Sequence, residues 1–598
     1  MLHKYVVIFV PLLLLQINVL ANPQITNLPG RNTTCLNGCW HVIVDPYENG
    51  YYNYRYEPSQ NGYFKDEKAK DKSDLVEYDF DRSGTLQVPG DWNSQRENLL
   101  YYEGTIWYKK SFDYLTLGKN RLFIHFGAAN YHAIVYLNGT KIGEHIGGFT
   151  PFNFEITSFV REKNNDIIVK VDNKRYREAV PTVNTDWWNY GGITRDVFLV
   201  ETRPTFIRDY CLQLKKGTSD EFEGWVQLDG EQLQQTVTID IHALKDQLEL
   251  FTNENGYAKI AFKADLELWE PENPKLHEVT FSCLTDHVSE SMGFRSVETH
   301  NQDIIVNGKP IFLRGICIHE EAPYRGGRAY SRDDAIQLLS WARELGCNFV
   351  RLAHYPHNEY MTRLADEWGI MVWSEIPVYW TILWENSDTY HNAETQLVEN
   401  ITRDKNRASV IIWSVANETP ILESRTKFLK NLITKTRSMD STRLVSAALE
   451  RHYVDEYTQM IDDPLGKYLD VIGCNEYIGW YDNLPAKIDH IKWKTVYNKP
   501  LIISEFGAGA LYGFHGDNLT RWSEEYQEYL YERQVKMLKK IDFLRGVTPW
   551  ILMDFRSPRR PLPNIQDGWN RKGLISNKGE KKKAFFVLQK YYGDIMEK

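Results

Sequence analysis

The spacing of hydrophobic residues changes near position 300 of this 598-residue chain. Before that point, short runs alternate between apolar and polar residues, as in β-strands that bury one face. The apolar run at 133–137 leads through Asn138-Gly139 into 141–143, which predicts two strands joined by a two-residue primed turn. Residues 204–297 also alternate and contain no helix-length periodic segment. We therefore predict an all-β sandwich at 22–203 and a small immunoglobulin-like sandwich at 204–297.

After residue 300, buried strands alternate with amphipathic helices. Ser331, with Asp334 three residues later, predicts a helix start, and Gly346 predicts its end. The apolar stripe of this helix consists of Ala335, Leu338, Leu339, Ala342 and Leu345. Buried strands are predicted at 311–314, 349–351, 371–374, 410–413, 444–446, 471–474, 501–504 and 547–551. Eight strands alternating with helices over about 300 residues predict a (β/α)8 TIM barrel at 298–598, with its active site at the carboxyl ends of the strands.

The first residues are predicted to be a signal peptide. His3 and Lys4 precede an apolar run at 5–15, and small residues at 19–21 offer a cleavage site, so the leader is assigned to 1–21. The chain is then exported, to the periplasm or the extracellular medium, or to the lysosome in a eukaryotic host. After the leader, no stretch approaches the roughly 18 apolar residues that span a bilayer.

Composition narrows the functional classes. Hydrophobic residues make up 42% of the chain and charged residues 25%, as in ordinary folded proteins, and the formal net charge is −10. Such a chain lacks the basic surface that nucleic-acid binding requires. The aromatic share of 13%, with 18 Trp and 36 Tyr, is high. It fits either a carbohydrate enzyme, whose aromatic rings stack on sugars, or aromatic-rich β cores.

The cysteines and histidines indicate no metal or cofactor site. The seven cysteines are an odd number without metal-ligand spacing. A Cys35–Cys39 disulfide is one interpretation, and unpaired thiols are the other. His319 and Glu320 follow the first predicted barrel strand, but they have no clustered third ligand, so hydrogen-bonded wall residues are the preferred interpretation.

Two glutamates stand at the ends of continuous apolar runs. Glu418 follows the fourth predicted barrel strand and Glu505 follows the seventh. Burying a carboxylate is costly unless it is paired or open to a ligand, so acids at such places are seldom structural filler. Strands four and seven face each other across a barrel mouth, and a retaining glycosidase needs two carboxyl groups about 5–5.5 Å apart. Glycosidic bond cleavage is therefore predicted, with a structural salt bridge as the alternative.

Further polar residues follow other predicted strands. Asn417, beside Glu418, suits a hydrogen bond to the sugar 2-hydroxyl, and Tyr477 suits a hydrogen bond that keeps the nucleophile charged. Arg351 and His354 either bind substrate or form a buried network that orients Glu505. The remaining candidates at strand ends are Glu375, Asn475 and Trp550.

Several stretches, in the same order along nearly the whole mature chain, resemble glycoside hydrolase family 2. They are 88–93 (VPGDWN), 103–108 (EGTIWY), Asn138-Gly139 and 147–152 (GGFTPF) in the first sandwich, and Arg314-Gly315, His354-Tyr355-Pro356, Asn417-Glu418 and 504–507 (SEFG) in the barrel. The resemblance implies a jelly-roll-like sugar-binding domain, an immunoglobulin-like domain and a TIM barrel. It also implies a metal-free retaining double displacement, with Glu418 as acid/base and Glu505 as nucleophile, in a dimer or tetramer.

Within that family, Asn570-Arg571-Lys572 is similar to the Asn-x-Lys motif with which β-glucuronidases hold the C6 carboxylate of glucuronic acid. An ammonium and an amide form charge-assisted hydrogen bonds with a carboxylate, and a neutral sugar has no such group. The stretch 475–481 is also glucuronidase-like and implies Tyr481 near that carboxylate. The stretch 186–192 implies that Asp186 binds the sugar 4-hydroxyl.

One position departs from the β-glucuronidase pattern. Gln566 stands four residues before Asn570, where well-studied β-glucuronidases carry an arginine. Either Arg559 or Arg560 replaces that arginine, or the pocket prefers another uronic acid such as galacturonic acid. The leading prediction is an exo-β-glucuronidase acting on glycans or small glucuronides. A β-galactosidase or β-galacturonidase is the second, and a non-catalytic carbohydrate-binding protein the third. The segment between Arg314 and Ser331 is short, which leaves room for an oligosaccharide leaving group.

Overall fold

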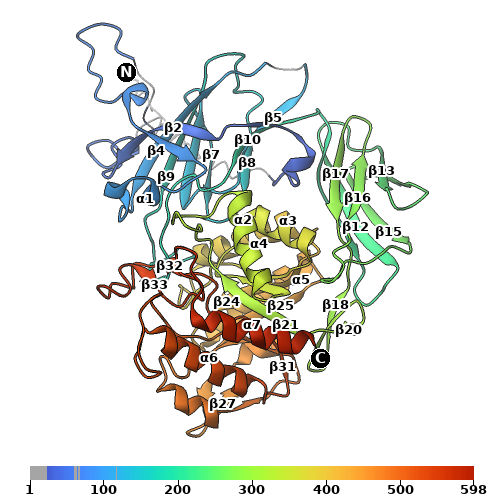
Figure 1. Ribbon diagram of the computed structural model, residues 1–598. Helices are drawn as coiled ribbons and strands as arrows, with labels where there is room; N and C mark the ends of the chain where they lie inside the picture. The colour runs from blue at the N-terminus through green and yellow to red at the C-terminus, as the bar shows by residue number, and fades with distance from the viewer. Residues whose placement is uncertain (1–22, 59–63, 65–67, 116–117, 598) are drawn as a thin grey trace, which may run out of the picture.

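The computed structural model describes residues 23–58, 64, 68–115 and 118–597 (Figure 1). Two β-sandwiches precede an eight-stranded barrel. The predicted signal peptide at 1–21 lies outside the described residues. Within the described part of the chain, no helix has both the length and the hydrophobicity to cross a membrane.

The first domain consists of two antiparallel sheets that pack face to face. One sheet has the strand order β3 (Thr85–Val88), β2 (Gly38–Asp45), β4 (Thr105–Phe112), β9 (Asn165–Asp172), β6 (His132–Leu137) and β7 (Thr140–Ile146). The other has the order β1 (Asn32–Cys35), β10 (Val197–Thr202), β5 (Arg121–Phe126) and β8 (Phe152–Glu155), and a short helix, α1 (Trp92–Gln95), follows β3. Ala133 and Val135 of β6 lie in the core between the sheets, as their alternation predicts.

Two local predictions in this domain can be checked. Asn138 and Gly139, between β6 and β7, both have positive φ, at 51° and 89°, so the primed turn is confirmed. Cys35 and Cys39 are free, exposed thiols, so the disulfide interpretation is wrong. The Cys39 thiol instead donates to the side-chain oxygen of Gln87 at 3.2 Å.

The second domain is a smaller sandwich with its own apolar core. Its sheets have the orders β11 (Phe206–Leu214), β12 (Glu221–Asp229), β15 (Tyr257–Lys263), and β14 (Leu248–Phe251), β13 (Thr236–Ile241), β16 (His277–Ser282), β17 (His287–Met292). A small sheet of β18 (Val297–His300), β19 (Asp303–Val306) and β20 (Lys309–Pro310) then leads into the barrel. Val297 and Ile304 of this sheet pack with Phe349 and Met371, which begin two barrel strands, so the sheet covers the amino end of the barrel.

The third domain is a closed barrel of parallel strands, as predicted. Its strands are β21 (Leu313–Ile318), β22 (Phe349–Leu352), β23 (Met371–Glu375), β24 (Val410–Asn417), β25 (Leu444–Leu449), β28 (Ile472–Asn475), β30 (Leu501–Glu505) and β31 (Leu544–Val547). The helices are α2 (Arg332–Glu344), α3 (Glu359–Trp368), α4 (Ser387–Asp404), α5 (Glu423–Met439), α6 (Glu524–Leu538) and α7 (Lys583–Met596). Ser331 and Asp334 form a capping box at the start of α2, and Gly346, with φ +91°, follows its end, as predicted.

Two barrel strands are displaced from their predicted positions. The first was predicted at 311–314, but β21 runs from Leu313 to Ile318 and so continues through Gly315. A Cβ at Gly315 would lie 2.6 Å from Thr548 and 2.8 Å from Phe349, so the glycine permits close packing inside a strand. The eighth strand ends at Val547, and residues 548–551 follow it as buried loop. Pro549 lacks the N–H that a central strand needs. The residues there are apolar because they are buried in the barrel mouth, not because they form a strand.

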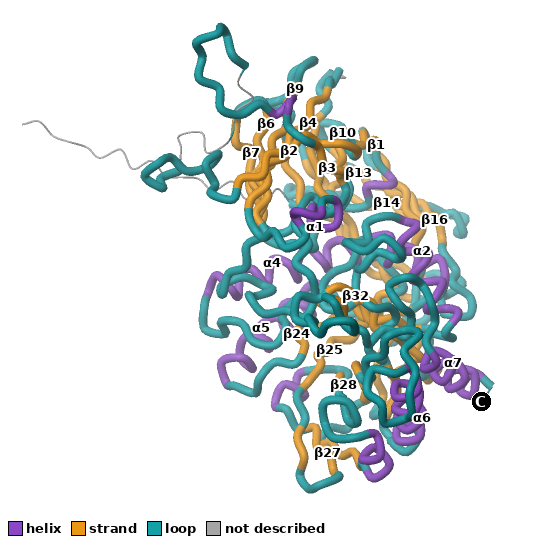
Figure 2. The backbone as a smooth tube through the Cα atoms, turned by 60° about the vertical axis from the view of Figure 1, so that its left-hand side comes forward, coloured by secondary structure: helices purple, strands orange, loops and turns teal. Residues whose placement is uncertain are grey.

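The first sandwich and the loops of the barrel mouth lie against each other. Figure 2 shows loops gathered around β32 (Phe555–Arg556), which pairs with β33 (Trp569–Asn570) beyond the eighth strand. Trp188 of the first domain donates its backbone N–H to the Arg556 carbonyl at 3.0 Å, and Tyr131 donates to Asn392 of α4 at 2.8 Å. A further sheet of β26 (His452–Tyr453), β27 (Thr458–Ile461) and β29 (Lys492–Thr495) lies among the loops after β25 and β28. Two domains therefore contribute to the wall around the mouth.

Candidate active site

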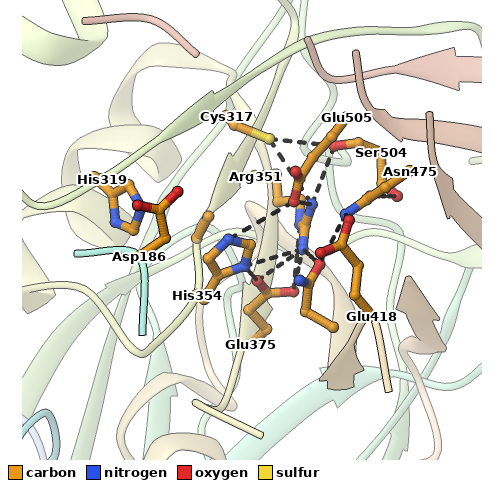
Figure 3. Close-up of polar contacts among 12 residues, drawn as sticks. Asp186, Cys317, His319, Arg351, His354, Glu375, Glu418, Asn475, Ser504 and Glu505 are labelled. Atoms are coloured by element: carbon orange, nitrogen blue, oxygen red, sulfur yellow. Dashed lines mark hydrogen bonds and ion pairs between the residues drawn. The ribbon is translucent and has the colours of Figure 1, made fainter. Parts of the chain in front are cut away.

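A buried arginine on β22 connects the polar groups at the barrel mouth (Figure 3). Arg351 donates to Glu505 at 2.9 Å and to the side-chain oxygen of Asn417 at 2.7 Å. It also donates to Glu375 at 3.0 Å. Burial would raise the pKa of Glu375, but the charge of Arg351 and a hydrogen bond with His354 lower it to about 2. The network thus holds an ionised carboxylate and a permanently charged guanidinium at the centre of the mouth.

Glu505, the last residue of β30, is 4% exposed. Its Oε2 accepts a hydrogen bond from the Tyr477 hydroxyl at 2.7 Å, and its Oε1 accepts the one from Arg351. His354 Nε2 lies 3.7 Å from Oε1. Burial raises the pKa of Glu505, an effect that Arg351 opposes and the charge of Glu418 increases. Two donors therefore fix the orientation of this carboxyl group and favour its ionised form.

Glu418 lies directly after β24 in the left-handed region, with φ 48°. Residues other than glycine are uncommon there, and such positions cluster at functional sites. Trp380 Nε1 donates to Glu418 Oε2 at 2.8 Å, and Asn475 Nδ2 donates to Oε1 at 2.9 Å. Asn475 is also in register with Glu505 on the adjacent strand. The two carboxyl groups thus share a neighbour and face the same mouth.

Only the oxygen of the Asn417 side-chain amide has hydrogen-bond partners among the described residues. Its oxygen accepts from Arg351 and from Asn475, at 2.7 and 3.1 Å, whereas its Nδ2 is buried with no hydrogen-bond partner among the described residues. A buried polar group without a partner costs about 1–3 kcal/mol. This amide is therefore available to donate to a ligand oxygen.

Aromatic rings wall the mouth. Trp550 lies in the loop after β31 and stacks on His354 with centroids 4.8 Å apart and an interplanar angle of 17°. Trp187 of the first domain packs edge-on against Tyr379, with centroids 4.9 Å apart. Such surfaces suit the C–H faces of a sugar, because they bury apolar area without offering competing polar groups.

His319 and Glu320 are wall residues, as their isolation in the sequence predicts. His319 Nδ1 lies 3.1 Å from the Tyr355 hydroxyl, and Glu320 is paired with Arg195 at 3.2 Å. Nowhere among the described residues do three His, Cys, Asp or Glu side chains come together in a way that could hold a metal. His319 Nε2 is buried without a hydrogen-bond partner among the described residues.

A second cluster lies beside Glu505 and centres on a buried lysine. Lys572 is 4% exposed, and its ammonium donates to the Tyr481 hydroxyl at 2.7 Å. It lies 4.7 Å from the ring centroid of Tyr481 and 5.4 Å from that of Tyr477. Burial would raise the pKa of Tyr481, but Lys572 and Arg560 outweigh it and lower the pKa. Lys572 forms no ion pair with any described residue, so the cluster favours an anionic ligand.

Asp186 reaches this cluster from the first domain. Its carboxylate accepts hydrogen bonds from Ser557 at 2.6 Å, from Arg560 Nε at 3.0 Å and from Asn570 at 3.3 Å. The Asn570 oxygen in turn accepts the backbone N–H of Lys572 at 3.1 Å. The structure thus brings together residues that the sequence singled out from segments almost four hundred positions apart.

Gln566 stands where the β-glucuronidase pattern has an arginine, and Arg559 and Arg560 are the two candidates to replace it. Arg560 lies in this cluster. It donates to the Tyr481 hydroxyl at 3.2 Å, in addition to its ion pair with Asp186. Arg559 lies instead over the ring of Trp380, 4.9 Å from its centroid. The Gln566 side chain forms no hydrogen bond with a described residue. Arg560 and Lys572 therefore donate to the same hydroxyl, that of Tyr481.

The sequence did not indicate Trp380. It lies in the loop between β23 and α4 and has φ 54°. Only the path of that loop brings the indole N–H to Glu418. An aromatic residue shortly after a barrel strand was the one available signal, and many aromatic residues in this chain share it.

Comparison with known proteins identifies the family. The model described as "Glycosyl hydrolases family 2, TIM barrel domain" matches residues 297–597, and that of the family's sugar binding domain matches 36–204. The chain belongs to glycoside hydrolase family 2. It is therefore a glycoside hydrolase of the fold that the sequence resemblance implies. A β-glucuronidase from Canis lupus familiaris is 28% identical over 568 residues, which cover 85% of this chain and 84% of that protein.

Solved structures of family 2 enzymes are similar along most of the chain. A β-glucuronidase from an uncultured Clostridium species has a TM-score of 0.82 at 25% identity, and the match covers 96% of this chain and 100% of that one. A β-galacturonidase from Eisenbergiella tayi, solved with bound galacturonate, has a TM-score of 0.78 at 24% identity, with 96% and 99% covered. The second likeness shows the fold alone.

Proposed function

We propose that this family 2 hydrolase is an exo-acting β-glucuronidase that retains the anomeric configuration. The observation that carries the proposal is the buried ammonium of Lys572, which has no anionic partner among the described residues. It lies next to Tyr477, whose hydroxyl is bonded to Glu505. A carboxylate at C6 of the sugar supplies the missing negative charge, whereas the CH2OH group of a neutral sugar does not. The similarity to β-glucuronidases supports the same assignment.

In this proposal, the reaction proceeds in two displacements at the anomeric carbon. Glu505 attacks C1 while Glu418 gives its proton to the glycosidic oxygen, so the bond to the leaving group breaks and a glycosyl-enzyme ester forms. Glu418 then takes a proton from water, the water oxygen attacks C1, and the ester bond to Glu505 breaks. The hydrogen bonds from Tyr477 and Arg351 keep Glu505 ionised and aligned for the first attack.

Substrate contacts follow from the unpaired groups. The free Nδ2 of Asn417 donates to the 2-hydroxyl, an interaction that strengthens as positive charge develops on the ring. Trp550 and His354 form the stacked surface under the sugar. In this proposal Asp186 binds the 4-hydroxyl, and its hydrogen bonds to Ser557 and Asn570, which join the two domains at this point, support a pocket that is closed at that end. A closed end admits only a terminal residue, which is the basis for exo action.

A β-galacturonidase is the second candidate, and Gln566 favours it. Galacturonic and glucuronic acid share the C6 carboxylate and differ in the orientation of the 4-hydroxyl. Lys572 therefore suits both sugars, and selection between them falls to Asp186 and Arg560, which are already ion-paired.

The 4-nitrophenyl β-D-glucuronide, β-D-galacturonide and β-D-galactoside, assayed side by side, test the assignment. We expect the highest kcat/KM on the glucuronide. Fastest turnover of the galacturonide supports the second candidate, and fastest turnover of the galactoside refutes a uronic acid pocket. Absence of turnover on all three supports a non-catalytic carbohydrate-binding protein.

A further inference from the structure

A cavity of about 380 Å³ opens on the Glu418 side of the barrel mouth. Its wall includes Trp380, Glu418, Glu450, Arg451 and Tyr481, and it does not include the side chain of the other catalytic candidate on β30. A general acid protonates the oxygen of the departing group, so that group must lie against the acid. This cavity is therefore the space that receives the leaving group.

Glu450 gives this cavity an unpaired carboxylate. It follows β25, is partly buried, and accepts no hydrogen bond from any described residue. Burial raises the pKa of Glu450, and the charge of Glu418 raises it further. The charges of Arg425 and Arg451 oppose this rise in the pKa, and Glu450 and Glu418 line the same cavity, which places the carboxylate close to the catalytic acid candidate. Partial burial without a donor leaves both of its oxygens available to hydroxyl groups of a ligand.

Arg451 gives the cavity a fixed guanidinium. Its Nε donates to the Asn475 carbonyl at 3.1 Å, and its Nη1 donates to the Gln459 side chain at 2.8 Å. These two bonds hold the planar group in one orientation, and its Nη2 makes no hydrogen bond with a described residue. A rigid donor and an acceptor carboxylate from adjacent positions therefore line the same cavity.

We propose that this cavity is a subsite for a sugar, so that the natural substrate is a glycan carrying a terminal uronic acid rather than a small aromatic glucuronide. Neighbouring hydroxyls of a pyranose donate to Glu450 and accept from Arg451, while the Trp380 indole, held by its bond to Glu418, forms part of the wall of the same cavity. A phenolic leaving group would cover both charged groups without bonding them, which costs binding energy.

The inference rests on the proposed function, and one pair of substrates separates the two. We would compare 4-nitrophenyl β-D-glucuronide with a disaccharide in which β-D-glucuronic acid is linked to a neutral hexose. Activity of the wild type on the nitrophenyl glycoside tests the proposed function. The ratio of kcat/KM for the disaccharide to kcat/KM for the nitrophenyl glycoside tests the subsite. If the wild type turns over only the galacturonide, the same ratio is measured with the corresponding galacturonic acid pair.

Glu450→Gln should lower that ratio about tenfold, because an amide loses the charge-assisted hydrogen bonds of the carboxylate. The substitution removes no described hydrogen bond within the protein, so the fold should persist, as a thermal unfolding scan will show. Glu456→Gln, an exposed position in the β26–β27 turn, is the matched control and should leave the ratio as in the wild type. A ratio that Glu450→Gln does not change, whether both activities fall together or neither falls, overturns the sugar subsite.

Discussion

Replacing Lys572 by alanine is the most direct test of the carboxylate pocket. The ammonium is 4% exposed and its one described hydrogen bond goes to Tyr481, so a bound C6 carboxylate would be its counter-ion. A hydrogen bond to a charged group contributes about 1.5–3 kcal/mol. Since about 1.4 kcal/mol corresponds to a factor of ten in rate, kcat/KM on 4-nitrophenyl β-D-glucuronide should fall about 10- to 150-fold.

The matched substrate is 4-nitrophenyl β-D-glucoside, which differs from the glucuronide only at C6. Lys572→Ala should lose far less activity on it, because no carboxylate is present to lose its partner. Lys578→Ala, an exposed lysine in the following turn, is the control variant and should behave as the wild type on both substrates. An equal loss on the glucuronide and the glucoside would mean that Lys572 acts by supporting Tyr481 and Tyr477, and it would remove the basis for a uronic acid substrate.

Three further predictions follow from the carboxyl groups. Glu418→Gln should lower kcat/KM for the hydrolysis of methyl β-D-glucuronide at least about 100-fold more than for the nitrophenyl substrate, because nitrophenolate leaves without protonation. Equal losses in kcat/KM on the two substrates would contradict the role of Glu418 as general acid. Tyr477→Phe should move the acidic limb of the pH profile of kcat/KM upward by about one pH unit. Burial already raises the pKa of Glu505, and the substitution removes a hydrogen bond that favours its ionised form. An acidic limb that does not move would contradict this role of Tyr477. Burial raises the pKa of Glu476 from 4.5 to about 7, so the folded state holds this proton more tightly and stability should fall as pH rises through that window, by up to about 3 kcal/mol. Urea unfolding at pH 5 and pH 8 should show a smaller difference for Glu476→Gln than for the wild type.

The barrel and the positions of its key residues could be predicted because parallel strands buried on both faces leave continuous apolar runs. Such runs make Glu418 and Glu505 conspicuous, since each carboxyl group stands where an apolar strand ends. The displaced eighth strand shows the limit of this signal. Residues 548–551 are as buried as a strand, and hydrophobicity alone cannot tell buried loop from buried strand.

Contacts that depend on the path of a loop could not be predicted. Trp380 reaches Glu418, and Arg560 reaches Tyr481, only because particular turns of the mouth bring them there. The sequence offered Arg559 and Arg560 as equal candidates. Neighbouring residues on an irregular loop point in different directions, which no periodic pattern reports.

The position of Asp186 makes the substrate pocket a joint product of two domains. Its carboxylate belongs to the first sandwich, yet it is held by Ser557, Arg560 and Asn570 of the barrel. The residues expected to break the glycosidic bond are all carried by the barrel itself. Mild heat or denaturant that loosens the contact between the domains would therefore lower the selectivity between sugars before it stops hydrolysis. The selectivity between sugars would then depend on how the two domains dock, and it would be lost at a lower temperature than hydrolysis itself.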